Sequence, residues 1–291
     1  MARIRVGISG FSYDDWRRRF YPEGLRRRDE LAYAAATFET IELNGTFYSL
    51  AEPASFRRWY DAAPRGFRYA VKGSRFITHN RKLADVDVAL ANFLASGILA
   101  LRDKLGPILW QLPPTLRFDA DRIDNFLSVL PRHTDEAGSI ARRHDGRVSD
   151  PLVRPDRRRR LRHVLEPRHE SWFNPEMVRI ARRHGVAIAF SHGSAWPYTE
   201  EVTAGFVYLR LHGPAALYAS SYGADGLACW ASRIRAWHRA SDPGDARRLT
   251  GRRPPRRRGR DVYVYFDNDV EARAPQEAEC LRRLLASRAG R

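Results

Sequence analysis

The densest set of reactive side chains in this sequence follows one short apolar segment. Val164 and Leu165 lead directly into Glu166, and Arg168 and His169 come next. A strand that ends in carboxylate, guanidinium and imidazole groups is typical of a site at a sheet edge rather than of a packed core. We predict Glu166 as a general acid or base, because desolvation in a semi-enclosed site raises a carboxyl pKa. Arg168 and His169 are predicted to bind an anionic substrate.

Two further strand-like segments end in groups of the same kind. Glu42 and Asn44 are two residues apart, so on a strand both side chains point to one side of the sheet. Glu42 is predicted as a general base, and Asn44 as a substrate contact. Lys72 is one of three lysines and ends another apolar segment. We predict a catalytic role for it, by binding phosphate, stabilising an enolate or forming an imine.

The remaining candidates also lie at strand ends. Arg210 and His212 alternate with leucines in a period of two, and we predict anion binding for Arg210 and proton transfer for His212. Gln111 and Asn268 end two more segments and are predicted to contact substrate. Tyr13 and Trp110, with Trp16 and Trp172, are predicted to line a pocket. The alternatives are buried ion pairs, turn chemistry and ordinary core packing.

The segments that carry these residues alternate with helix-like stretches along the whole chain. The expected strands are 4–9, 40–43, 68–71, 108–111, 163–166, 187–190, 206–211 and 262–266, and the expected helices are 30–38, 54–62, 84–101, 120–130, 136–143, 175–184, 224–239 and 275–287. Eight such units predict a (β/α)₈ TIM-type parallel barrel formed by one domain over residues 1–291. An open doubly wound sheet is the alternative, although no Gly-x-Gly-x-x-Gly follows any expected strand.

The strong positive charge of the chain is local. The formal net charge is +17, of which residues 154–163 carry +5 and residues 246–260 carry +8. The surrounding segments, about 146–162 and 241–260, are rich in Pro, Gly or Arg and are predicted to be mobile surface loops. We favour solvated loops, and keep nucleic-acid binding through these arginines as the alternative.

The composition also bounds the compartment and the partners. No apolar run is long enough to span a membrane, and no signal peptide is expected at the N-terminus. Cys229 and Cys280 are far apart in sequence, which is typical of a reducing cytoplasm rather than of a disulfide framework. We therefore expect a cytoplasmic protein without membrane contact.

Seven blocks in order along the chain resemble the YecE-like family, a domain of unknown function. They include Val6–Tyr13, Glu42–Tyr48, Phe67–Lys72, Leu109–Pro114, Glu166–Trp172, Tyr208–Gly213 and Val264–Asp269. The resemblance implies a TIM-type barrel and a cytoplasmic, bacterial-type protein, and it implies no established reaction. This chain departs from the family pattern at three places. The family usually has Ser or Asn-Ser where this chain has Gly45, Val where it has Pro167, and an acidic residue near Ser191 and His192.

These observations together predict an enzyme that acts on a small polar or anionic substrate, bearing a sugar or phosphate, at the C-terminal mouth of the barrel. The reaction class stays open among hydrolase, lyase and isomerase. No cofactor is evident, and a divalent metal held by Glu42, Glu166, His169, His212 and Asp267 is a minor alternative that rests on fold analogy. We also predict an excess of about one positive charge in the mouth, because three cations face two carboxylates there: Lys72, Arg168 and Arg210, with Glu42 and Glu166.

Overall fold

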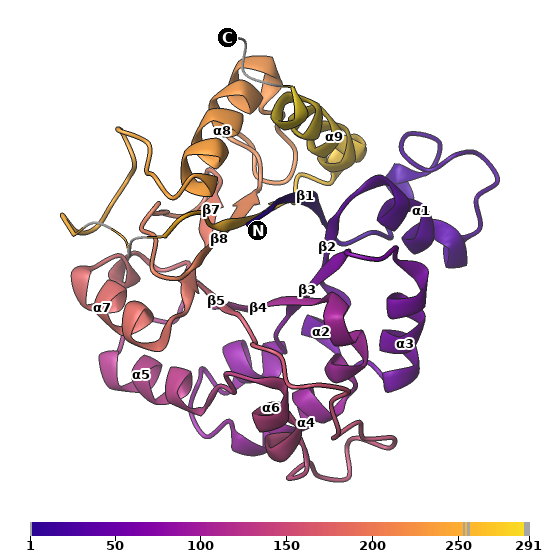
Figure 1. The fold of residues 1–291 in the computed structure, drawn as a ribbon, viewed down its shortest axis with the longest axis vertical. Coiled ribbons are helices and arrows are strands. Elements are labelled where there is room, and N and C mark those ends of the chain that lie inside the picture. The colour runs from indigo at the N-terminus through magenta and orange to yellow at the C-terminus, as the bar shows by residue number, and fades with distance from the viewer. Residues whose placement is uncertain (1, 253, 255–256, 288–291) are drawn as a thin grey trace.

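Parallel strands form a closed ring at the centre of the molecule, and helices surround it (Figure 1). The computed structural model describes residues 2–252, 254 and 257–287. The sheet order is β6-β5-β4-β3-β2-β1-β9-β8-β7. The strands are β1 (Ile4–Ser9), β2 (Thr40–Leu43), β3 (Arg68–Lys72), β4 (Leu105–Gln111), β5 (His163–Glu166), β6 (Ala187–Ile188), β7 (Phe190–His192), β8 (Phe206–Leu211) and β9 (Asp261–Phe266).

The two ends of this sheet order are consecutive in the chain. β6 pairs with β5, β7 pairs with β8, and only Ala189 separates β6 from β7. The Ala189 N–H still donates to the Leu165 carbonyl oxygen at 2.9 Å, so the sixth strand of the barrel is interrupted without leaving the ring. The nine segments thus occupy eight strand positions, and the predicted TIM-type parallel barrel of one domain is confirmed.

Except for residues 84–101 and the short α2, the helices lie close to where the sequence alternation predicts them. Asn174 caps α7 by accepting a hydrogen bond from the Met177 N–H at 2.9 Å, and Pro175 occupies the first turn. The helices are α1 (Glu30–Thr37), α2 (Gly45–Tyr48), α3 (Pro53–Ala62), α4 (Asp87–Ala95), α5 (Ala120–Val129), α6 (Thr134–Ala141), α7 (Pro175–His184), α8 (Gly223–His238) and α9 (Arg273–Ala286). Shorter helical turns are η1 (Asp14–Trp16), η2 (Arg27–Asp29), η3 (Phe76–Asn80), η4 (Ile98–Lys104), η5 (Glu170–Trp172) and η6 (Val270–Ala272).

The single helix predicted over residues 84–101 is wrong. The segment forms α4 and then the separate turn η4, with the break at Gly97, whose φ is 122°. A β-carbon at Gly97 would lie 2.5 Å from the Cα of Pro53, so the close approach of α3 requires glycine there. Tertiary contact therefore ends a helix that apolar periodicity alone would continue.

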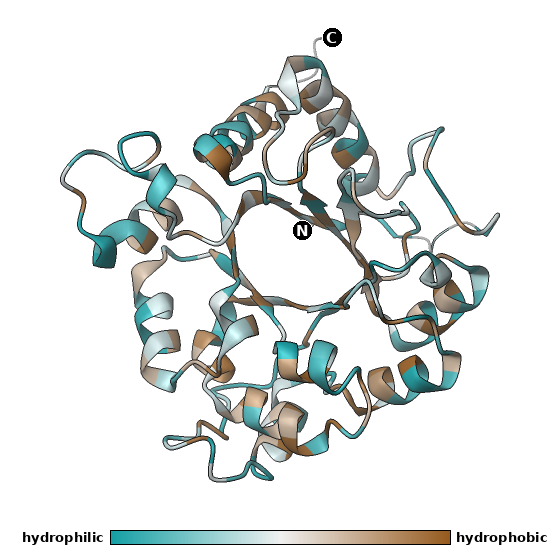
Figure 2. Ribbon diagram, turned by 180° about the vertical axis from the view of Figure 1, so that it is seen from behind, coloured by the Kyte–Doolittle hydropathy of each residue, from teal (hydrophilic) through white to brown (hydrophobic). Residues whose placement is uncertain are grey.

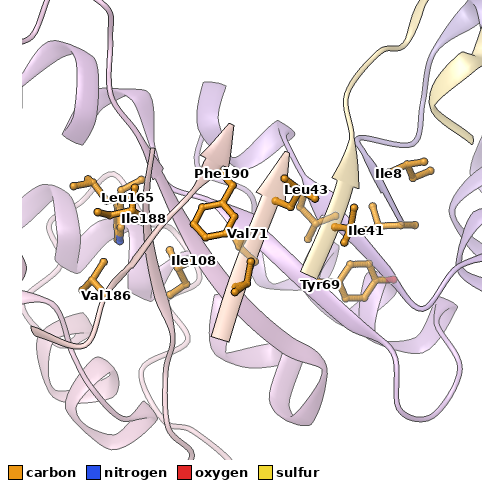
Figure 3. Packing of buried hydrophobic residues seen from close by; sticks show 14 of the residues in the cluster. Ile8, Ile41, Leu43, Tyr69, Val71, Ile108, Leu165, Val186, Ile188 and Phe190 are labelled. Atoms are coloured by element: carbon orange, nitrogen blue, oxygen red, sulfur yellow. The ribbon is translucent and has the colours of Figure 1, made fainter. Parts of the chain in front are cut away.

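Two apolar layers hold the barrel together. Outward-facing strand residues such as Ile8, Val71 and Leu165 pack against the helices (Figure 3). Apolar residues gather on the strands and the helices around them, while the long loops are mostly hydrophilic (Figure 2). Inside the ring lies a second buried cluster of small and aromatic side chains: Ala70, Leu109, Val164, Ala187, Ala189, Ala204, Phe206, Tyr208, Tyr263 and Tyr265. The interior is thus a packed core rather than a pore.

Both arginine-rich segments form loops, and both are tied to the folded body. Residues 146–162 contain no helix, and Arg162 pairs with Asp261 at 2.7 Å. In the second loop, the Glu201 carboxylate accepts from the Leu249 and Thr250 N–H groups at 2.8 and 2.9 Å. Residues 253, 255 and 256 of this loop lie outside the described residues. The mobility of the loops stays a prediction.

In the part of the chain that the structure describes, no helix has the length and apolar character needed to cross a membrane.

Gly7 tests the close packing of the ring. A β-carbon there would lie 1.8 Å from the Thr40 carbonyl oxygen of the neighbouring strand. We expect Gly7→Ala to lower the free energy of unfolding by at least about 2 kcal/mol, because β1 would have to move away from β2. Urea unfolding measures this loss. Gly244→Ala is the matched control, since nothing lies within 4 Å of its added carbon. Equal stability of the two variants would contradict the tight ring.

Candidate active site

Charged side chains from five strand positions meet inside the C-terminal end of the barrel. They are carried by β2, β3, β5, β8 and the residue that follows β9: Glu42, Lys72, Glu166, Arg210 and Asp267. Four of them point inward because they share parity with a residue of the inner cluster, as Arg210 does with Tyr208. Glu42 shares parity with Thr40, whose hydroxyl lies 2.7 Å from that of the inner Tyr265. All five are at most 8% exposed. Parallel strands end at one rim, so side chains distant in sequence become neighbours here.

The guanidinium of Arg210 lies at the centre of this cluster. Its Nη2 is 2.7 Å from Glu42 Oε1 and 2.9 Å from Asp267 Oδ2, and its Nη1 is 3.0 Å from Glu166 Oε2. Nη2 also donates to Ser9 Oγ at 3.1 Å. The sequence predicts that Arg210 binds an anionic substrate. Its side chain is only 1% exposed and both terminal nitrogens already bind carboxylates, so neither of them is free to bind a substrate.

The expectation that burial raises the pKa of Glu166 is wrong. Desolvation acts in that direction, but the positive charges of Arg210 and Arg168 outweigh it and hold the pKa well below its usual range. Arg168 donates to Glu166 Oε1 at 3.2 Å. The pKa of Asp267 is lowered in the same way, with desolvation outweighed mainly by Arg210. Both carboxylates are ionised at neutral pH and hold no proton to donate.

A chain of polar contacts links His212 to the same carboxylates. Ser191 Oγ donates to Glu166 Oε1 at 2.7 Å and lies 3.0 Å from His212 Nε2. His212 Nδ1 is 2.9 Å from Asp267 Oδ2, without the alignment of a full hydrogen bond. The rings of Trp196 and Tyr218 meet the His212 ring edge to face at 5.2 and 5.6 Å. The imidazole is thus buried among groups that can accept or pass a proton.

Lys72 is the exception in this paired cluster. Its Nζ makes no hydrogen bond and no ion pair to any described residue, and it lies 4.6 Å from the centre of the Phe47 ring. The side chain is 8% exposed. Burial, followed by repulsion from Arg210, lowers its pKa to about 8, although the carboxylates oppose the shift. Lys72 is therefore a buried amine close to the point of losing its proton.

Other polar groups follow the C-terminal ends of neighbouring strands. Asn44 donates to Ser9 Oγ at 3.0 Å, while its own Oδ1 is buried and finds no donor among the described residues. Gln111 is 6% exposed, and its side chain makes no hydrogen bond to the described residues. Tyr13 donates to the Ser9 carbonyl oxygen at 2.9 Å. The guanidinium carbon of Arg168 lies 3.9 Å from the centre of the Trp196 ring. Asn44, Gln111, Tyr13 and Arg168 thus lie at or just after the C-terminal ends of strands, and their contact with a substrate stays a prediction.

Two predicted site residues face away from the mouth, and the ring of a third, His169, is bound locally. Trp110 faces outward, buried between Phe93 and Phe126, because its parity on β4 is opposite to that of Gln111. Asn268 is also outward-facing, and it donates to Glu277 at 2.7 Å. His169 Nδ1 accepts from the Ser171 N–H at 3.1 Å and caps η5.

Sequence reasoning missed four members of the site. Ser9 and Ser191 hold the carboxylates, Trp196 covers His212, and Asp269 sits beside Asp267 with its pKa raised to about 8 by burial and by the Asp267 charge. The sequence did indicate which residue after β9 points inward. Tyr263, Tyr265 and Asp267 are spaced by two, so Asp267 lies on the inner side of the strand and Asn268 on the outer side. No comparable signal marks Trp196, which lies on a loop.

The charge balance differs from the predicted one. With Asp267 included, the three cations Lys72, Arg168 and Arg210 face the three carboxylates Glu42, Glu166 and Asp267, which leaves no positive excess. Within the described residues, no three or more His, Cys, Asp or Glu side chains are placed to hold one metal ion. Arg210 fills the centre between the carboxylates that the metal alternative invoked.

Arg210→Met tests this ionic centre. It leaves three carboxylates buried without their main partner, so we expect a loss of about 3 to 5 kcal/mol at pH 7. In the wild type, the lowered pKa values of Glu166 and Asp267 add stability at neutral pH that is lost as pH falls below about 4. In the variant these pKa values rise, so the carboxylates take up protons as the pH falls. The difference in the free energy of unfolding between variant and wild type should therefore be smaller at pH 5 than at pH 7. Urea unfolding at both pH values measures it.

The control is Arg179→Met, which removes an exposed partner of Glu176. Such a pair contributes at most about 1 kcal/mol. A loss in Arg210→Met that is no larger than in this control, or one that does not shrink with acid, would contradict the central role of Arg210.

Comparison with known proteins gives the same barrel and a family. Residues 5–291 match the model of the family described as "Protein of unknown function DUF72". The UPF0759 protein YecE of Escherichia coli is 23% identical over 249 residues, covering 82% of this chain and 84% of the relative. A DUF72 family crystal structure from Thermotoga maritima has a TM-score of 0.71 and 23% identity over 98% of this chain and 99% of its own. One from Enterococcus faecalis has a TM-score of 0.68 and 16% identity, covering 99% of this chain and 97% of its own. The barrel and its charged mouth are thus those of a member of the DUF72 family, to which this chain belongs.

Proposed function

We propose that this protein is an enzyme that moves a proton on a small polar, anionic substrate, bearing a sugar or phosphate group, at the C-terminal mouth of the barrel. The observation that carries the proposal is Lys72. Its amine is buried, has no hydrogen-bond or ion-pair partner among the described residues, and has a pKa of about 8. Burying an unpaired charge costs free energy, and such costs gather at functional sites.

Lys72 is suited to two tasks. While protonated, it attracts an anionic group, and the neighbouring carboxylates cannot satisfy it because Arg210 already binds them. With a pKa of about 8, about a tenth of the side chain is neutral at pH 7, which is enough for a general base in a protected site. Lys72 therefore combines the two roles that the sequence divided between a lysine and a glutamate.

The unused polar atoms at the mouth support a ligand of this kind. Buried polar atoms in folded proteins nearly always have partners. Here Asn44 Oδ1, Asp269 Oδ1 and Arg168 Nε are buried without one among the described residues. With the amide of Gln111, they offer acceptors and donors suited to a hydroxyl-rich molecule. Tyr13 and Trp196 add aromatic faces beside them.

The roles of the other predicted catalytic residues follow from their partners. Glu42 and Glu166 act as fixed charges that hold Arg210 in place, since Glu166 stays ionised. His212 serves as a second proton carrier through Ser191, which lies 3.0 Å from its Nε2. Asp269, with a pKa of about 8, is the carboxyl group able to donate a proton at neutral pH.

Nucleic-acid binding through the arginine-rich loops is the less favoured alternative. Arginines of the first loop pair with acidic residues of this same chain, as Arg158 does with Asp135 at 3.3 Å and Arg159 with Asp156. These pairs reduce the charge available to a phosphate backbone.

The Lys72 amine should titrate near pH 8. The sequence has three lysines, so reductive methylation with ¹³C-formaldehyde gives a spectrum with few signals. We expect the signal that disappears in Lys72→Arg to move between pH 7 and pH 9, well below the ordinary lysine pKa of about 10.4. The direction follows from burial, which disfavours the charged form. A midpoint above pH 10 would show that Lys72 is an ordinary ammonium group and would remove the proposed base.

Proton transfer should depend on Lys72. We propose to incubate the protein in D₂O with a panel of aldoses, ketoses, sugar phosphates and hydroxy acids, and to follow loss of C–H signals by NMR. For the compound that exchanges, we expect Lys72→Met to slow exchange by at least about 100-fold, the usual contribution of a general base. Gln111→Ala should raise KM more than it lowers kcat.

The control is Lys82→Met, because Lys82 is an exposed lysine that makes none of the site contacts described above. This variant should exchange at the wild-type rate. Undiminished exchange in Lys72→Met, or no exchange of any compound in the panel, would count against the proposal.

A further inference from the structure

A second charged pocket lies at the opposite, N-terminal end of the barrel. It has a volume of about 200 Å³. Its arginines come from the beginnings of β1 and β3 and from the segment that leads into β5: Arg5, Arg68, Arg159, Arg160 and Arg162. Asp261, the first residue of β9, lines it as well. Three of these arginines belong to the first arginine-rich run, so part of that run is not a solvated loop but one wall of a pocket.

The carboxylates around this pocket do not balance its arginines. Asp261 is shared, since it lies 2.7 Å from Arg162 Nη2 and 3.7 Å from Arg5 Nη1. Asp103 also lines the pocket, and Asp156 pairs with Arg159 from outside it at 2.8 Å. Five guanidinium groups against these three carboxylates leave an excess of two positive charges.

Arg5 is the deepest of these cations, and it is only partly satisfied. The residue is 7% exposed, and its Nη1 atom is buried without a hydrogen bond to any described residue. The distance of 3.7 Å to Asp261 is too long for a hydrogen bond. A buried guanidinium with an unused donor costs free energy unless a partner binds there. The unused Nη1 donor therefore indicates a ligand in the pocket, separately from the excess of positive charge.

The pKa of Arg68 reflects the same local excess of positive charge. Burial, and then repulsion from Arg5, lowers its pKa below the ordinary arginine value. Arg162 adds to this repulsion, although its own charge is bound to Asp261. An anion placed between these arginines would relieve their mutual repulsion and fill the free donors.

The barrel core separates this pocket from the mouth. Tyr263 borders the pocket, with the guanidinium carbon of Arg5 5.4 Å from its ring centre. Beyond it, Tyr208 and Tyr265 are fully buried within the barrel, their rings tilted against each other with centres 4.9 Å apart. No ligand can therefore contact both ends of the barrel at once through the interior.

We infer that this pocket is a second binding site, which takes the phosphate or diphosphate group of a small molecule. Several guanidinium forks around one pocket match the charge and the oxygen geometry of phosphate better than those of a single carboxylate. A small ligand is favoured over nucleic acid because the deepest cation, Arg5, lies inside the pocket. The backbone of a duplex runs across a surface and does not enter such a space. The inference stands independently of the proposed function, which uses the other end of the barrel.

Inorganic pyrophosphate is the probe for this site, with binding measured by isothermal titration calorimetry at fixed ionic strength. We expect saturable binding at one site per chain and a melting temperature that rises with ligand concentration. Arg160→Gln should weaken binding at least about tenfold, the loss expected for one charge-assisted hydrogen bond. Arg160 is exposed, so this variant keeps the fold. Arg68→Gln, on the opposite wall of the pocket, should weaken pyrophosphate binding in the same way.

Two controls separate the possible outcomes. Arg157→Gln removes an exposed charge of the same run outside the pocket and should leave binding within about twofold, as should Lys72→Met in the mouth. Equal weakening by Arg157→Gln and Arg160→Gln would mean diffuse surface attraction, and tight, salt-sensitive binding of a DNA duplex would then make nucleic acid the better ligand. Loss only in Lys72→Met would place the anion in the mouth and overturn this inference. Absence of pyrophosphate binding at millimolar concentration would overturn it as well.

Discussion

The buried guanidinium of Arg210 is the interaction on which the rest of the barrel mouth depends. It binds carboxylates from β2, from β5 and from the end of β9, and is itself carried by β8. Each of these charges would be costly to bury alone, and together they compensate one another only if the strands stay in register. The network therefore fixes the relative positions of distant strands. It also sets the protonation of its neighbours, since Arg210 keeps Glu166 ionised and helps to lower the pKa of Lys72.

This pairing divides the mouth into two layers. The lower layer is electrically balanced and closed to solvent, because the carboxylates and Arg210 satisfy one another. The upper layer keeps its polar groups unused, since Lys72 Nζ, the Gln111 amide and Asn44 Oδ1 make no hydrogen bond or ion pair to the described residues. A protein that only stabilised its fold would gain by pairing or removing these groups. Rigid charges below and free polar groups above are the arrangement that a preorganised site requires.

The two ends of the barrel are chemically different for a topological reason. The mouth gathers the last residues of the strands, where carboxylates and cations alternate around the rim. The opposite end gathers the first residues, among which arginines exceed carboxylates. The aromatic layer of Tyr208, Tyr263 and Tyr265 lies between them and prevents direct contact. At 15–23% identity the solved relatives support the common fold, while the chemistry of either end has to be argued from this chain's own side chains.

The sequence by itself determined the fold and which strand ends carry charge. Apolar segments of period two, each followed by polar residues, were sufficient to predict eight parallel strands and to group Glu42, Lys72, Glu166, Arg210 and His212 at one end. Strict use of the same parity would also have assigned Trp110 and Asn268 to the outside, and Asp267 to the site. Only the tertiary structure decided which charged side chains form ion pairs with one another. Arg210 meets Glu42 and Glu166 across separations of 168 and 44 residues, and no local pattern encodes such contacts. Those contacts reverse the expected pKa shift of Glu166 and leave Lys72 as the unpaired group, because a buried charge responds to its neighbours in space rather than in sequence.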